Sequence, residues 1–145
     1  MPRVLVVDDD TEIRALLEHI LINESLEVDC ARNGREALAL MRQHEYAVML
    51  LDLMMPEMNG FEMLEVMRTE RHPVVLVVTG AGQSTIDELD SRIVHGIIRK
   101  PFEPEELARV VRACAEIRDS SGLGTMAFAT MLAGGPLIAF LSAKM

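Results

Sequence analysis

The chain has 145 residues, 50% of them hydrophobic, and a formal net charge of -9 at pH 7. A chain of this size and apolar content can bury the core of one domain without disulfides or a structural metal. The acidic excess would repel nucleic acid and anionic lipid, and no run of Lys and Arg offsets it, so direct nucleic-acid binding is not expected.

Short apolar runs alternate with helical patterns along the chain as far as Ser120. The runs are about five residues long and rich in Val, as is typical of buried strands. Between them, apolar residues recur three and four positions apart, as at Ile13, Leu17 and Ile20, which indicates amphipathic helices. The predicted strands are 4–7, 26–31, 47–51, 74–78 and 94–98, and the helical stripes lie at 13–21, 37–41, 61–67, 86–93 and 107–114.

Local signals mark where two of these helices begin. Asp10 or Thr11 would cap the first helix, and Pro104 falls in the first turn of the last one, where a missing amide donor costs little. Strict strand and helix alternation with short loops predicts parallel pairing, right-handed crossovers and helices on both faces of the sheet. The sequence therefore predicts a five-stranded, doubly wound α/β domain over residues 1–119, with an apolar tail at 120–145.

Polar side chains follow four of the predicted strands. Asp8 and Asp9 follow the first, Asp52 the third, Thr79 the fourth and Lys100 the fifth. Ligands bind at the carboxyl ends of the strands in an open parallel sheet, so we expect these groups to converge on one pocket. Each residue type alone is also common in caps, turns and solvated edges. Only the joint pattern points to a site.

Three carboxylates together suit a hard divalent cation, because Mg²⁺ prefers oxygen ligands and can bridge a carboxylate to a phosphoryl oxygen. An Asp between a strand and a helix is often only an N-cap. We assign that role to Asp10 and predict a metal site for Asp8, Asp9 and Asp52. The four histidines are scattered, fit no metal spacing and are interpreted as surface or core residues.

The joined motifs resemble the receiver domain of response regulators in two-component signalling. The resemblance covers roughly residues 3 to 118 and lies in Val6-Val7-Asp8-Asp9-Asp10, Asp52 to Gly60, Thr79-Gly80 and Lys100-Pro101-Phe102. It implies a flavodoxin-like fold with strand order 2-1-3-4-5. It also implies phosphoryl transfer from the phosphohistidine of a histidine kinase to one aspartate.

The resemblance also implies a role for each metal-site residue. Asp9 and Asp52 would ligate Mg²⁺ directly, Asp8 would act mostly through water, and the backbone carbonyl of Met54 would complete the protein's share. The cofactor expected here is therefore Mg²⁺, held by Asp8, Asp9, Asp52 and Met54.

Three residues receive the phosphoryl-transfer roles in the same way. Asp52 would be the phosphoacceptor, Lys100 would neutralise a phosphoryl oxygen and Thr79 would donate a hydrogen bond to another. Such a site works by positioning and charge stabilisation. The protein would be a switch that assists its own phosphorylation and dephosphorylation, not a metabolic enzyme. The resemblance further implies a cis bond between Lys100 and Pro101.

The chain departs from the family pattern at the position three residues before the lysine. Receivers usually carry Tyr or Phe there, and the ring moves inward when the threonine shifts toward the phosphoryl group. Ile97 is short, stiff at its first torsion and cannot reproduce an aromatic rotamer switch. The helix that precedes this strand is also expected to be short, with Ile93 where a helix-ending Gly is common. We therefore expect an altered partner face.

The tail is the second departure, since residues 120–143 contain no charged side chain. Three interpretations stay open: packing or self-association, a membrane anchor at residues 123–143, and a remnant of a larger regulator. Gly134-Gly135-Pro136 divides the tail into two short apolar pieces, so packing or self-association ranks first. The N-terminus has no signal-peptide pattern, so we expect a cytoplasmic protein, with membrane contact as the alternative.

These observations favour a single-domain response regulator that signals by protein contact. Its phosphodonor partner would be a sensor histidine kinase or a phosphotransfer protein, and its downstream partner is a protein that the sequence does not identify. The alternative is a phosphorylation-independent interaction module that uses its tail for self-association or membrane attachment. A third hypothesis, a metal-dependent phosphatase of small molecules, is opposed by loops too short to build a substrate pocket.

Overall fold

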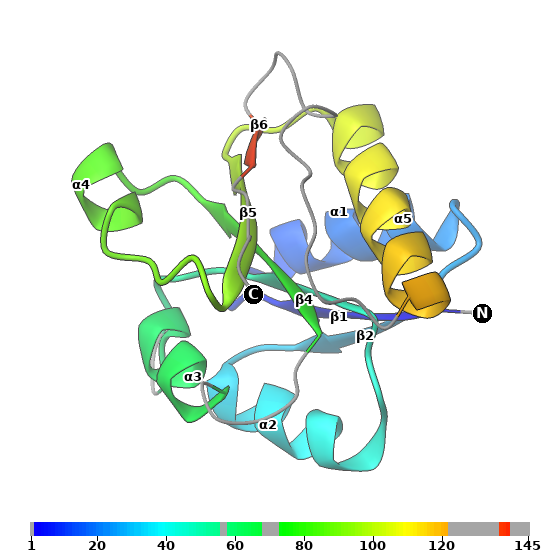
Figure 1. Ribbon diagram of the computed structural model, residues 1–145, viewed down its shortest axis with the longest axis horizontal. Coiled ribbons are helices and arrows are strands. Elements are labelled where there is room, and N and C mark those ends of the chain that lie inside the picture. Colours follow the sequence, from blue (N-terminus) through cyan, green and yellow to red (C-terminus); the bar gives the residue numbers. More distant parts are fainter. Residues whose placement is uncertain (1, 56–57, 68–72, 122–136, 140–145) are drawn as a thin grey trace.

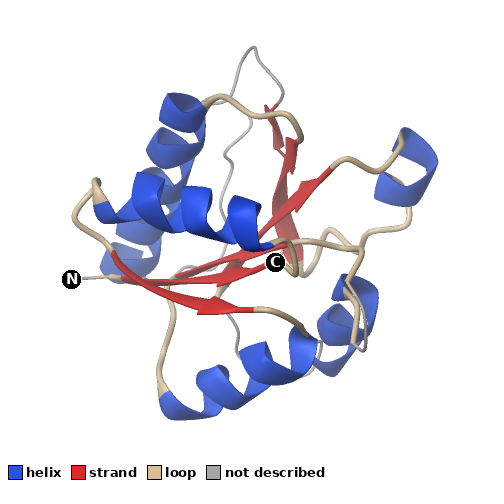
Figure 2. Ribbon diagram, turned by 180° about the vertical axis from the view of Figure 1, so that it is seen from behind, coloured by secondary structure: helices blue, strands red, loops and turns tan. Residues whose placement is uncertain are grey.

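A central β-sheet separates two layers of helices in the computed structural model, which describes residues 2–55, 58–67, 73–121 and 137–139 (Figure 1). Helices α1 and α5 cover one face, and α2 and α3 cover the other, as the reverse view also shows (Figure 2). The strands are β1 Arg3–Val7, β2 Glu27–Ala31, β3 Val48–Leu51, β4 Val74–Thr79, β5 Val94–Arg99 and β6 Leu137–Ala139. The helices are α1 Thr11–Ile22, α2 Gly34–Gln43, α3 Gly60–Met67, α4 Gln83–Ile86 and α5 Pro104–Ser121.

The first strand explains why the strands appear in the sequence as unbroken apolar runs. Val4 and Val6 pack in the core beneath α1 and α5, whereas Leu5 and Val7 pack in the core on the opposite face. All four side chains are buried, because each side of a parallel sheet is covered by helices. The sheet therefore has two separate cores, one on each face.

Five strands run parallel in the order β2-β1-β3-β4-β5, so the predicted doubly wound fold with strand order 2-1-3-4-5 is confirmed. The sheet also has a sixth strand that was not predicted. In β6, Ile138 pairs antiparallel with Ile97 of β5. Its residues belong to the segment expected to be a tail, and apolar periodicity alone does not show which edge such a short run joins.

The tail predictions concern residues that are for the most part not described. Residues 122–136 and 140–145 lie outside the described part of the chain, so self-association, membrane attachment and the separate tail at 120–145 stay predictions. Among the described residues, no helix combines the length and the apolar character that a membrane crossing needs.

Side-chain caps fix where the helices begin. The side chain of Asp10 accepts hydrogen bonds from the amides of Glu12 and Ile13 at 2.9 and 3.2 Å. Asp10 is therefore the N-cap of α1, and Thr11, the other residue considered for this role, is the first residue of the helix. Helix α5 begins at Pro104, as predicted. At α3, the side chains of Asn59 and Glu62 each accept from the other residue's amide. This capping box was not recognised in the sequence.

The predicted helical stripe over residues 86–93 was wrong as secondary structure, because α4 ends at Ile86. The carboxylate of Asp90 accepts from the amide of Arg92 at 2.9 Å, and the carbonyl of Asp90 accepts from Ile93 and Val94. These local bonds offer the backbone an alternative to the helix. The apolar spacing has a packing role instead, since Ile86 and Ile93 are both buried in the core beneath α2 and α3.

Gly60 controls the path of the chain after Asp52. Its amide donates to the carbonyl of Leu53 at 2.9 Å. A Cβ atom at Gly60 would lie 2.7 Å from both the Asp52 carbonyl oxygen and the Leu53 Cα, closer than real Cβ atoms approach backbone. Gly34 makes a similar contact, since its amide donates to the carbonyl of Met58 at 3.2 Å. Two glycines therefore hold the loop that follows the third strand.

We predict that Gly60→Ala lowers the free energy of unfolding by about 1–3 kcal/mol, because the added methyl group pushes against backbone that cannot move aside easily. Urea unfolding followed by circular dichroism measures the change. Gly82→Ala is the matched control, since a Cβ there would meet nothing within 4 Å. Equal losses in the two variants would contradict the steric explanation.

Candidate functional site

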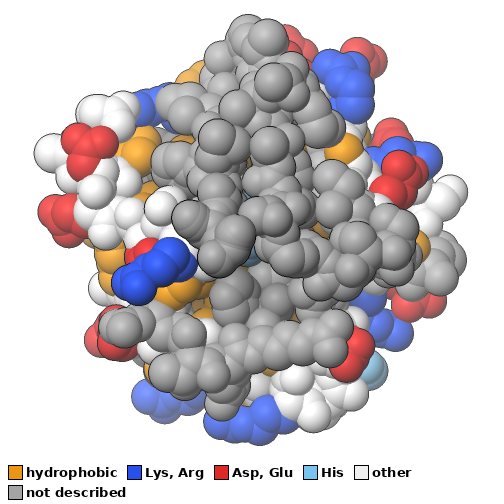
Figure 3. Space-filling model, viewed as in Figure 1, with side chains coloured by type: hydrophobic (Ala, Val, Ile, Leu, Met, Phe, Trp, Pro, Cys, Tyr) orange, Lys and Arg blue, Asp and Glu red, His pale blue; other side chains and the backbone are white. Residues whose placement is uncertain are grey.

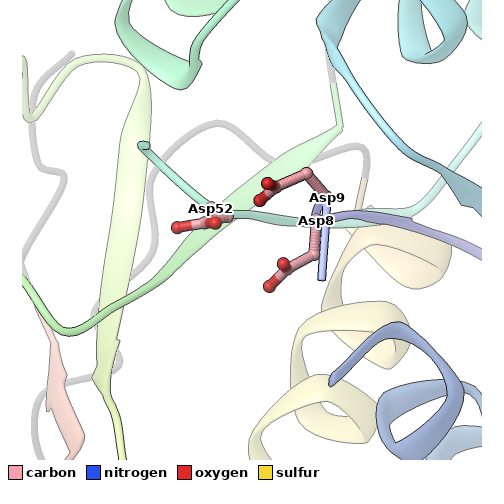
Figure 4. Close-up of side chains that lie close together, drawn as sticks. All are labelled: Asp8, Asp9 and Asp52. Atoms are coloured by element: carbon pink, nitrogen blue, oxygen red, sulfur yellow. The ribbon is translucent and has the colours of Figure 1, made fainter. Parts of the chain in front are cut away.

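Three carboxylates meet at the carboxyl ends of β1 and β3. These strands are neighbours with Val7 paired to Leu51, so Asp8, Asp9 and Asp52 leave the sheet side by side. One oxygen from each carboxylate lies within 4.8 Å of the others. Figure 4 shows the three side chains extending toward the same side of the strand ends. The structure thus brings together the acidic residues that the sequence singled out.

Burial makes this cluster electrostatically unfavourable. Asp8 is 1% exposed and Asp52 is 7% exposed, whereas Asp9 is exposed to solvent. Burial, and then the charge of Asp8, raises the pKa of Asp52 to about 6, although the Lys100 ammonium opposes the shift. A cation with oxygen ligands would relieve this repulsion, so the donor set fits a divalent ion such as Mg²⁺.

Lys100 supplies the positive charge within the site. It directly follows β5, and its Nζ lies 3.3 Å from Asp8 Oδ2 and 4.0 Å from Asp52 Oδ1. Its amide donates to the carbonyl of Thr79 at 2.9 Å, which ties the ends of β4 and β5 together. The bond from Lys100 to Pro101 is cis, as the resemblance implied. One ammonium thus faces two buried carboxylates and compensates them only in part.

Thr79 is the last residue of β4 and is fully buried. Its Oγ1 accepts from the amide of Ala81 at 3.0 Å. A hydroxyl that accepts in this way keeps its own hydrogen for donation. Thr79 is therefore able to donate a hydrogen bond without losing its contact with the following loop.

Met54 is the residue whose backbone carbonyl is predicted to bind the metal. The amide of Met54 points back to Asp52 Oδ1 at 3.4 Å, a long bond. Its side chain is 64% exposed, which is unusual for a large apolar group. The metal role of the Met54 carbonyl stays a prediction.

Sequence reasoning missed Arg14, which supports the acidic cluster from α1. Its NH1 donates to the backbone carbonyl of Asp8 at 2.8 Å, and the Asp10 amide donates to Asp8 Oδ1 at 2.9 Å. Both bonds fix the backbone and side chain of Asp8. The available signal was spacing, because Arg14 lies one helical turn after the Asp10 cap and therefore above the strand end.

The surface charges are mixed. On the face in Figure 3, the described Lys and Arg side chains are scattered around the rim, with acidic side chains among them. Several arginines are paired: Arg3 with Glu27, Arg92 with Asp90 and Arg112 with Glu24. Such pairs leave less positive charge available for a phosphate backbone.

The parallel strand order and the acidic residues at the ends of β1 and β3 agree with the resemblance to signalling receiver domains. The family model of the response regulator receiver domain matches residues 4–112, and the chain belongs to this family. Receiver domains of this family interact with histidine kinases or phosphotransfer proteins.

Individual relatives support the assignment. The transcriptional regulatory protein SrrA of Staphylococcus aureus is 38% identical over 112 residues, which are 76% of this chain and 46% of SrrA. This chain thus spans about half the length of the curated relatives it matches. A CheY-like receiver domain protein of Methanospirillum hungatei is 27% identical with a TM-score of 0.76, over 84% of this chain and 99% of that one. The response regulator TrrA of Thermotoga maritima, solved in complex with Mg²⁺-BeF, is 32% identical with a TM-score of 0.70, over 79% and 99%.

We predict that Asp52→Asn stabilises the metal-free protein at neutral pH. With a folded-state pKa of about 6 against 3.8 as the ordinary value, Asp52 binds its proton more tightly in the native state than in the unfolded chain. The free energy of unfolding therefore falls as pH rises through this window. After allowance for solvent screening, Asp52→Asn is expected to raise the free energy of unfolding by about 1–2 kcal/mol above about pH 6 and by close to zero below about pH 4.

Urea unfolding without divalent cations, at about pH 4 and about pH 7.5, measures this difference. Glu45→Gln, which changes an exposed carboxylate, is the control and is expected to alter stability little at either pH. A gain from Asp52→Asn that is equal at both pH values would contradict an effect of ionisation.

Proposed function

We propose that this chain is a response regulator that accepts a phosphoryl group on Asp52 in an Mg²⁺-dependent reaction and signals through protein contacts. The donor would be the phosphohistidine of a histidine kinase or a phosphotransfer protein. The observation that carries the proposal is the meeting of Asp8, Asp9 and Asp52 with Lys100 at one end of the sheet.

The hydrogen bonds favour Asp52 over Asp8 as the phosphoacceptor. Both oxygens of Asp8 are already engaged, one with the Asp10 amide and the other with Lys100. From the described residues, Asp52 accepts one hydrogen bond, a long one from the Met54 amide. A nucleophilic carboxylate needs an accessible lone pair, so the less engaged oxygens of Asp52 are better suited to attack.

In the transfer, an Asp52 oxygen forms a bond to phosphorus while the bond from phosphorus to the donor nitrogen breaks. A bound Mg²⁺, held by Asp8, Asp9, Asp52 and the Met54 carbonyl, would supply positive charge that lets two anionic groups approach. Lys100, already 4.0 Å from Asp52, is placed to neutralise a phosphoryl oxygen. Thr79 would donate its free hydroxyl hydrogen to another, and the rest of the catalysis is positioning.

One observation favours the alternative, an interaction module that works without phosphorylation. Ile97 is fully buried in the core beneath α2 and α3, where receivers usually have a mobile ring. Its strand is also paired along its outer edge by β6. Against this, TrrA, which is 32% identical, was solved with Mg²⁺-BeF, and the acidic cluster, Thr79 and Lys100 are all present in this chain.

We predict that a small phosphodonor such as phosphoramidate adds one phosphoryl group to the wild-type protein in the presence of Mg²⁺ and none to Asp52→Asn. Intact-protein mass spectrometry with and without Mg²⁺ measures the product. Asp29→Asn is the matched control, since this carboxylate is engaged by Tyr46 and Arg3 away from the site. A folded wild-type protein that gains no phosphoryl group would favour the interaction module.

Removal of the ammonium in Lys100→Met is expected to slow phosphorylation about 100-fold, the effect typical of losing one group that stabilises developing charge. The initial rate of mass gain at saturating Mg²⁺ gives the comparison. Arg92→Ala removes a cation that is exposed and paired with Asp90, so its rate is expected to match the wild type. Similar rates in Lys100→Met and the wild type would rule out this role for Lys100.

A further inference from the structure

The peptide unit that joins Asp8 to Asp9 lies just beyond the end of β1. The Asp8 amide donates to the carbonyl of Ala31, the last residue of β2, at 3.1 Å. In a parallel ladder, the Asp8 carbonyl would accept from the amide two positions after Ala31. That position is Asn33, which lies outside β2 and is the N-cap of α2. Within the described part of the chain, the sheet therefore gives the Asp8 carbonyl no backbone donor.

Arg14 supplies the missing donor from the first turns of α1. Its NH1 donates to the Asp8 carbonyl oxygen at 2.8 Å, and its side chain is half-buried. The Arg14 amide donates to the carbonyl of Asp10, the N-cap residue, at 2.9 Å. The start of the helix thus fixes the backbone of Arg14, and the guanidinium ties this helix to the end of β1.

Asp9 depends on this bond more than Asp8 does. The carboxylate of Asp8 is held by the Asp10 amide at 2.9 Å and by Lys100 Nζ at 3.3 Å. Asp9 is exposed, and no hydrogen bond to its carboxylate is found among the residues that the structure describes. The nitrogen and Cα of Asp9 share one plane with the Asp8 carbonyl, because a peptide unit is planar. Arg14 therefore fixes the plane from which the Asp9 side chain projects.

We propose that Arg14 is a positioning residue for the Mg²⁺ site and acts through Asp9. This role rests on the proposed function, in which Asp9 is an Mg²⁺ ligand. One carboxylate oxygen of Asp9 already lies within 4.8 Å of oxygens of Asp8 and Asp52. A fixed peptide plane keeps it there before the ion binds, so less conformational freedom is lost on binding. Removal of a group that orients a metal ligand typically weakens metal binding about 10- to 100-fold.

The charge of Arg14 alone would have the opposite effect on Mg²⁺ binding. A guanidinium stays protonated in proteins and repels a divalent cation nearby. If Arg14 contributed only its charge, removal of the side chain would tighten Mg²⁺ binding. A positioning role predicts weaker binding instead. The direction of the change in Mg²⁺ affinity therefore separates the two roles.

The first arm of the test measures the Mg²⁺ dissociation constant of the full chain by NMR titration with MgCl₂. Arg14→Met removes the guanidinium but keeps an apolar stem, and is expected to raise the constant about tenfold. Arg14→Lys keeps the charge and a donor on a shorter stem, so its constant is expected to lie between those of Arg14→Met and the wild type. A constant at or below the wild-type value in either folded variant would overturn the proposal.

Arg32→Met is the matched control for the loss of one positive charge. Arg32 directly follows β2, is exposed and pairs with Glu36 at 2.9 Å. Its removal is expected to leave the Mg²⁺ dissociation constant unchanged or slightly lower. If Arg32→Met weakened Mg²⁺ binding as much as Arg14→Met does, the specific role of Arg14 would be wrong.

A double-mutant cycle tests whether Arg14 acts through Asp9. In an Asp9→Asn background, Arg14→Met is expected to raise the dissociation constant by less than about twofold, because the carboxylate that Arg14 positions is absent. A general loss of structure would weaken binding by the same factor in both backgrounds. An equal effect of Arg14→Met with and without Asp9→Asn would overturn the route through Asp9.

The rate of phosphorylation by phosphoramidate gives a second readout. The Mg²⁺ concentration at the half-maximal rate is expected to rise about tenfold in Arg14→Met, whereas the rate at saturating Mg²⁺ stays within about twofold of the wild type. A slower maximal rate with the wild-type Mg²⁺ dependence would overturn the positioning role alone. A folded wild-type protein that binds no Mg²⁺ would overturn the proposed function, and this role with it.

Discussion

Three carboxylates, those of Asp8, Asp9 and Asp52, lie close together at the carboxyl end of the parallel sheet, and the Lys100 ammonium offsets their charge only in part. The pairing of Val7 with Leu51 forces Asp8 and Asp52 to emerge as neighbours. Burial removes Asp52 from water, and this desolvation, followed by the charge of Asp8, raises the pKa of Asp52 to about 6. A bound cation would relieve this repulsion, and Lys100 would help to neutralise a phosphoryl group at the site.

The two sides of the site are held by different kinds of contact. The loop after Asp52 is held by the close approach of Gly60 to the backbone of Asp52 and Leu53, where no Cβ atom fits, and by the hydrogen bond from the Gly34 amide to the Met58 carbonyl. The loop after Thr79 is held mainly through side-chain bonds from Arg99 and to the Thr79 hydroxyl. Backbone packing resists displacement, whereas single hydrogen bonds exchange readily.

Prediction from sequence succeeded where the signal was local or repeated. All five parallel strands and the Asp10 cap followed from apolar runs and capping chemistry, which depend on neighbouring residues alone. The prediction of a helix failed over residues 86–93. The apolar residues there are spaced by three and four positions as in a helix, but hydrogen bonds to Asp90 form a turn instead. Prediction from sequence also missed β6, because the edge that a three-residue strand joins depends on what else is exposed along the sheet.

The order of strands and helices, and a polar group after each of four strands, follow from the amino-acid sequence alone, because periodicity and the ends of strands depend on neighbouring residues. Which of these polar groups meet depends on the folded structure. It placed Lys100 closer to Asp8 than to Asp52, brought Arg14 onto the Asp8 carbonyl, and joined Arg99 to both Ala81 and Gln83. These contacts join segments distant in the chain, and their partners are set by strand order and side-chain reach.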